Sequence, residues 1–118
     1  MVGDATPLKT ALERLTAFAQ AGADCLYAPG LSEQDQITAI VKAVAPKPVN
    51  VLMSRPNPNM SVAVLADLGV RRISVGSALA RVAWGGFIRA AKQLADGSFD
   101  GFTGAASIKE LDQVFENH

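Results

Sequence analysis

One unit occurs twice in this sequence: a helix-like stretch, a Gly, a short apolar run, and a Gly-containing turn into the next helix. The first copy covers Ala17–Glu33 and the second covers Val64–Arg81, with the apolar run Pro48–Met53 between them. Strands separated by a helix's length of chain pair in parallel, because a parallel crossover needs about a dozen residues or more. The repeat therefore predicts an α/β fold with about three parallel strands and flanking helices.

The predicted helices are delimited by capping residues and by glycines. We expect the first helix to begin after Thr6, a common N-cap residue, and to end before Gly22, which suits the left-handed conformation after a helix. Ser32, with Asp35 three positions later, predicts the start of the next helix, and Pro46 predicts its end. Helices and strands are thus expected to alternate along the chain.

Three apolar runs are the predicted strands, and three further helical patterns follow. The strands are Ala23–Ala28, Pro48–Met53 and Arg71–Val75. The further helices are Ser61–Leu68, Ala78–Ala95 and Ala106–Phe115. We place a boundary after residue 96, between a partial (βα) barrel segment, 1–96, and a Gly-rich link with a C-terminal packing helix, 97–118.

Three parallel strands leave unpaired sheet edges. A closed (βα)8 barrel needs eight strands, and an exposed edge beside apolar side chains invites association. The sequence therefore predicts either part of a larger barrel or an assembly in which chains complete one another. The position of Met1, where a barrel would have finished an earlier strand, favours an incomplete chain.

Composition excludes several classes of partner and adds little else. Lys plus Arg and Asp plus Glu number 11 each in the 118 residues, so no charge excess points to nucleic acid or to a membrane surface. The chain has one Cys, which cannot form an internal disulfide, and no apolar run long enough to span a bilayer. A cytoplasmic location is the expectation.

The candidate binding residues lie on or just after the second predicted strand. Asn50 is an amide inside an apolar run, which either faces a barrel interior and holds a substrate carboxylate or hydrogen-bonds neighbouring backbone. Ser54 and Arg55 follow the carboxyl end of that strand, where barrels place their active sites. Arg55 suits an anionic ligand, with a solvated loop Arg as the alternative.

Gly76 and Ser77 open the long helix after the third strand. The free N–H groups and the helix dipole there attract anions, while Ser77 is equally an ordinary N-cap. Arg71 and Arg72 are expected to precede the third strand, at the stability end of a barrel rather than at its catalytic end. No Asp, Glu or His cluster follows a strand, so no catalytic residue and no metal ligand is assigned.

The segments GADCLYAPGL (22–31), PVNVLM (48–53) and LGVRRISVGSALARVAWGGFIRAAKQL (68–94) carry a family resemblance. Together they resemble the C-terminal part of the isocitrate lyase/phosphoenolpyruvate mutase superfamily, and most closely its phosphonomutase-like subgroup. The resemblance implies the last three strands of a modified (β/α)8 (TIM) barrel, with a C-terminal helix swapped between the subunits of a homo-oligomer.

The resemblance also implies a chemistry. Superfamily enzymes, lyases and isomerases, cleave or form C–C or P–C bonds next to a 2-oxo acid through a magnesium-bound enolate. The substrate would be a small 2-oxo acid or phosphonate. The acidic residues that hold Mg²⁺ and the catalytic loop of the family have no counterpart in this sequence. Pro29 and Gly30 stand where several members have Glu or His, which departs from the true lyases and mutases.

Three functions are consistent with the sequence. The first is the C-terminal segment of such an enzyme, inactive as an isolated chain and completed by another segment of barrel. The second is a non-catalytic oligomerisation module related to the family. The third is a phosphate-binding half-barrel of another (βα)8 family, based on Gly76 and Ser77.

Overall fold

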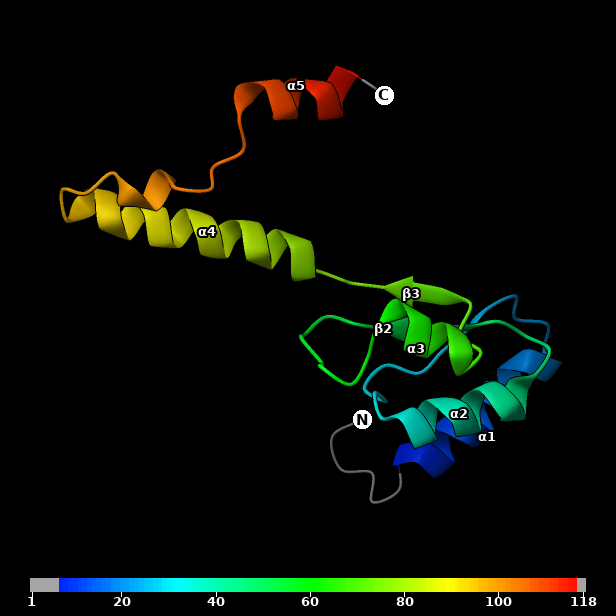
Figure 1. The fold of residues 1–118 in the computed structure, drawn as a ribbon. Helices are drawn as coiled ribbons and strands as arrows, with labels where there is room; N and C mark the ends of the chain where they lie inside the picture. Colours follow the sequence, from blue (N-terminus) through cyan, green and yellow to red (C-terminus); the bar gives the residue numbers. More distant parts are fainter. Residues whose placement is uncertain (1–6, 117–118) are drawn as a thin grey trace. The chain divides into compact units, whose positions relative to one another are not determined.

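A computed structural model describes residues 7–116 of the chain, so the predicted N-cap Thr6 lies outside the described residues. Helices and strands alternate along most of the chain, as expected (Figure 1). The elements are α1 (Pro7–Gln20), β1 (Leu26–Tyr27), α2 (Gln34–Val44), β2 (Val49–Leu52), α3 (Val62–Asp67), β3 (Arg72–Ser74), α4 (Ala78–Ala95), the 3-10 turn η1 (Asp100–Phe102) and α5 (Ile108–Glu116). They form two compact units, one ending at Ala78 and one starting at Leu79.

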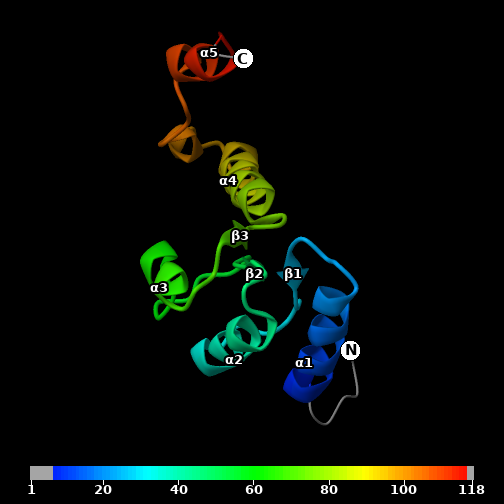
Figure 2. The ribbon, with the colours of Figure 1, turned by 90° about the vertical axis from the view of Figure 1, so that its right-hand side faces the viewer.

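The first unit is a parallel three-stranded sheet in the order β1-β2-β3. Tyr27 pairs with Asn50, and Asn50 pairs in turn with Arg72, so these three side chains start from neighbouring positions on one face. Helices α1, α2 and α3 lie on the opposite face (Figure 2). The α/β prediction of three parallel strands with flanking helices is confirmed.

The core lies between these helices and the sheet. The alternation of side chains along β2 sends Val49 and Val51 toward the helices, where both are buried. Buried residues from α1, α2 and α3 meet them there. The core side chains are Ala11, Leu15, Leu26, Leu31, Ile37, Ile40, Val44, Val49, Val51, Leu65 and Val70. The other face of the sheet, which we call the inner face, carries Asn50 and Leu52.

Two predicted details of the first unit are wrong. The strand expected over Ala23–Ala28 is paired only at Leu26 and Tyr27, because β1 has a partner on one edge alone within the described residues. The N-cap of α2 is Glu33 rather than Ser32: Gln36 Oε1 accepts from Glu33 N–H at 3.4 Å, and Asp35 Oδ1 accepts from Gln36 N–H at 2.8 Å. The cap therefore lies one residue further along the chain than the Ser32–Asp35 pair predicted.

The second unit consists of α4, η1 and α5. Gly101 of η1 packs so closely on α4 that an added Cβ would lie 2.6 Å from Ala90 Cα. The rings of Phe99 and Phe102 lie beside each other with centroids 6.0 Å apart. No residue of α4 or α5 is buried.

Within the described residues, no helix combines the length and the apolar character that a bilayer crossing requires. The predicted boundary after residue 96 stays a prediction.

The start of α5 is held by a reciprocal pair of hydrogen bonds that should make this helix sensitive to acid. The backbone N–H and the hydroxyl of Ser107 each donate to Glu110 Oε2 at 2.7 Å, and Glu110 N–H donates back to Ser107 Oγ at 3.2 Å. The bond from the Ser107 backbone, followed by the bond from its side chain, lowers the pKa of Glu110 below its ordinary value of 4.5.

We expect α5 to lose this cap as the pH falls. Because the folded pKa is the lower one, the stabilisation is complete above pH 4.5 and disappears as the pH drops through the folded pKa. NMR amide shifts of residues 107–111, followed in an acid titration, measure the loss. Glu110→Gln should remove the pH dependence, whereas Asp112→Asn on the same helix should retain it. A titration unchanged in Glu110→Gln would contradict this role.

Candidate functional site

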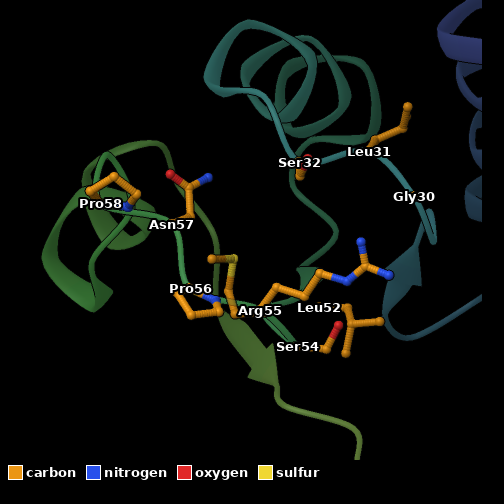
Figure 3. A pocket seen from close by; sticks show the side chains of 10 residues that line it. Gly30, Leu31, Ser32, Leu52, Ser54, Arg55, Pro56, Asn57 and Pro58 are labelled. Atoms are coloured by element: carbon orange, nitrogen blue, oxygen red, sulfur yellow. The ribbon is translucent and has the colours of Figure 1, made fainter. Parts of the chain in front are cut away.

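A hollow of about 530 Å³ opens at the carboxyl ends of β1 and β2. It lies between the turn after β1 and the Pro-rich loop after β2 (Figure 3). Its lining consists of Gly30, Leu31, Ser32, Leu52, Met53, Ser54, Arg55, Pro56, Asn57 and Pro58. The carboxyl ends of parallel strands are the usual location of ligand sites in α/β proteins. The loop 54–59 is therefore at the edge of the sheet where the sequence predicted it.

Among the described residues that line this hollow, Arg55 is the one that carries a charge. Figure 3 shows its side chain extended from the loop toward the side where Gly30 lies. Its guanidinium is exposed, and Ser54 beside it is half-buried. A guanidinium presents donors and a permanent positive charge without any acceptor, so the hollow favours an anionic group. The structure thus places the predicted residues Ser54 and Arg55 at one cavity.

Gly76 and Ser77 follow β3 and are both exposed. Gly76 has φ +55°, and a Cβ added to it would lie 3.4 Å from Leu52 Cδ1, a side chain that lines the hollow. Gly76 therefore lies next to Leu52, which lines the hollow. Neither Gly76 nor Ser77 is itself among the described lining residues. An anion-binding role for the pair remains a prediction.

Asn50 lies apart from the hollow, on the inner face of the sheet, and is 4% exposed. Its Oδ1 accepts a hydrogen bond from Arg72 Nη1 at 3.0 Å, and its Nδ2 donates to Ser74 Oγ at 3.0 Å. Its side-chain partners are therefore side chains of β3 rather than neighbouring backbone. Whether Asn50 contacts a substrate stays a prediction.

Arg72 is the residue that sequence reasoning missed. The sequence placed it at the amino, stability end of the third predicted strand and assigned it no binding role; it is the first residue of β3 and pairs with Asn50 in the sheet. The signal was present in the alternation of Arg72, Ile73 and Ser74, which puts two polar side chains on the face where β2 presents an amide.

The described residues do not make a metal site. No three side chains of His, Cys, Asp or Glu in this part of the chain come together in a way that could hold an ion. A Mg²⁺ site requires carboxylate oxygens in near-octahedral arrangement. The magnesium implied by the resemblance therefore does not fit the side chains present, and no reaction step is assigned through it.

Comparison with known proteins gives a consistent picture. The family model for phosphoenolpyruvate phosphomutase matches residues 1–95. A crystal structure of a candidate lyase/mutase from Burkholderia cenocepacia J2315 is 44% identical, with a TM-score of 0.83 over 92% of this chain. The structure of 2,3-dimethylmalate lyase, a member of the PEP mutase/isocitrate lyase superfamily, has a TM-score of 0.71 at 23% identity over 90% of this chain, which shows a shared fold.

The chain is short compared with these proteins. It spans 39% of the Burkholderia chain and 39% of the 2,3-dimethylmalate lyase chain. An uncharacterized protein of Mycobacterium tuberculosis (strain CDC 1551 / Oshkosh) is 35% identical over 66 residues, which are 56% of this chain and 24% of that protein. The three-stranded unit thus corresponds to part of the barrel of each solved relative.

Proposed function

Because the chain belongs to the phosphoenolpyruvate phosphomutase family, within the PEP mutase/isocitrate lyase superfamily, we propose that it forms the C-terminal part of an enzyme of the phosphonomutase-like type. That enzyme would cleave or form a C–C or P–C bond beside the carbonyl of a small 2-oxo acid or phosphonate. Membership over residues 1–95 and the hollow at the carboxyl ends of the strands support this proposal.

The observation that carries the proposal is the single cation in the hollow. A 2-oxo acid carries a carboxylate, and developing charge on its carbonyl oxygen is stabilised by preorganised donors. Arg55 offers paired donors for the carboxylate, and the neighbouring Ser54 adds a hydroxyl at the same rim. We assign these two residues to binding and orientation of the anionic end of the substrate.

The isolated chain should bind without turning over substrate. Enolate chemistry of this family uses Mg²⁺, and the described residues supply no ligand set for it. The ion would be held by residues of the barrel outside this chain, where the proposal also places the acid–base groups. A cytoplasmic location is part of the same proposal.

Arg55→Ala should weaken binding of a 2-oxo acid by about tenfold or more, because a charge-assisted pair contributes roughly 1.5–3 kcal/mol. Isothermal titration of the 118-residue chain with oxaloacetate measures the change. Arg71→Ala serves as the matched control, since Arg71 lies outside the hollow. Equal affinity of the Arg55→Ala and wild-type chains would contradict the assignment. A loss of folding stability as large as the loss of binding free energy would make Arg55 a structural residue.

A second function is favoured by a separate observation, the apolar surface of the second unit. Leu79, Val82, Trp84, Phe87, Ile88 and Leu94 of α4 are all exposed. A helix that is apolar on most of its sides is normally buried. We therefore propose that the chain also self-associates through this unit. If the titration detects no binding of a 2-oxo acid, oligomerisation is the proposed function of the chain.

A further inference from the structure

The inner face of the sheet carries a hydrogen-bonded chain of three polar side chains that the proposed function does not use. Arg72 donates to Asn50, and Asn50 donates to Ser74, each at 3.0 Å. All three lie outside the hollow that contains Arg55. Asn50 is almost completely buried, so its amide orientation is fixed by these two bonds.

The three side chains have unused N–H and O–H hydrogen-bond donors, whereas their acceptor oxygens already accept hydrogen bonds. The guanidinium has five N–H donors and no acceptor, and its bond to Asn50 is the one side-chain hydrogen bond that it makes within the described residues. Asn50 Oδ1 accepts from Arg72, and Ser74 Oγ accepts from Asn50. The hydroxyl proton of Ser74 and the second amide N–H of Asn50 have no acceptor in this part of the chain.

Arg72 also has no counter-ion within residues 7–116. The ion pair found there joins Lys9 to Glu13 on α1, at 4.0 Å. A positive charge surrounded by surplus donors and without a carboxylate attracts an oxyanion, because charge-assisted hydrogen bonds are the stronger ones. We propose that Arg72, Asn50 and Ser74 bind a small oxyanion, a carboxylate or a phosphate group, on the inner face of the sheet.

Titration of the isotope-labelled 118-residue chain tests this site. Inorganic phosphate and oxalate are added in separate titrations at constant ionic strength, and NMR follows the side-chain signals of Asn50 and Arg72. Both signals should shift and saturate, and the tighter of the two anions identifies the chemical class. Arg72→Met should weaken binding at least about tenfold. Arg71→Met should stay within about twofold, because the one hydrogen bond of its guanidinium to a described residue goes to the Val70 carbonyl at 3.5 Å.

Asn50→Asp keeps the proposal testable if Arg72→Met fails to fold. The carboxylate retains the acceptor for Arg72 but supplies an internal counter-ion, so anion binding should be lost while the backbone amide spectrum stays native. Absence of saturable shifts, or equal weakening by Arg71→Met and Arg72→Met, would overturn the site. Shifts confined to Ser54 and Arg55 would overturn it as well and would leave the Arg55 hollow as the anion site.

Discussion

Gly69→Ala should destabilise the first unit by roughly 2–5 kcal/mol, a large share of the total stability of a small domain. Gly69 ends α3 with φ +91°, a conformation that costs an L-residue about 1–2 kcal/mol. An added Cβ would also lie 2.8 Å from Val41 Cγ1 of α2. Val41 has little freedom to move away, because a β-branched side chain in a helix strongly prefers one rotamer.

Two further variants separate the causes of that loss. Gly22 has φ +100° but no atom within 4 Å of an added Cβ, so Gly22→Ala should show the backbone strain alone. The double variant Gly69→Ala/Val41→Ala should recover the part due to the clash. Urea unfolding monitored by far-ultraviolet circular dichroism measures all four proteins. Equal costs at Gly22 and Gly69 would show that the contact with Val41 contributes nothing.

The fold was predictable from the sequence because its signals are local. Gly22 and Gly69 adopt the left-handed conformation that a helix stop requires, and Ser61 Oγ accepts from Val64 N–H at 3.2 Å as an N-cap. The apolar run of β2 is buried as its composition indicates. The length of β1 was not predictable, because it depends on which residues find a ladder partner in β2.

The candidate site was predictable only in part, for a related reason. Ser54 and Arg55 follow a strand directly, so their place at the carboxyl edge follows from strand polarity alone. The contact between Arg72 and Asn50 joins residues 22 positions apart and depends on the register of β2 with β3. The alternation along β3 assigns Arg72 to a face of the sheet, but its partner on β2 also depends on the geometry of the segment that connects the two strands.

On the proposal that the chain self-associates through its second unit, deletion from Gly104 onward should give a monomer. The four large apolar side chains of α5 are exposed, and two of them, Ile108 and Phe115, are more than three-quarters exposed at 79% and 76%. Burying such a side chain contributes roughly 1.5–3 kcal/mol, so a partner surface for α5 would stabilise an oligomer. The four residues are Ile108, Leu111, Val114 and Phe115.

Spacing and charge both point to one face of α5 as the contact. Ile108, Leu111 and Phe115 recur at steps of three and four, which aligns them along one side of the helix. The helix carries three acidic residues and one Lys, whereas the charged residues of α4 are Arg81, Arg89 and Lys92. Opposite charges on the two helices favour contact between α5 of one copy and α4 of another.

A pair of point variants tests this face without shortening the chain. Leu111→Lys and Asp112→Asn each raise the net charge of α5 by one unit, the first by adding a positive charge and the second by removing a negative one, but only the first changes the apolar side. Light scattering at micromolar concentration should show a monomer for Leu111→Lys and for the deletion, and the native mass for Asp112→Asn. An unchanged number of copies per particle after the deletion would exclude α5 as the association element. Loss of association in Leu111→Lys, with association retained in Asp112→Asn, would identify the apolar side of α5 as the contact between copies.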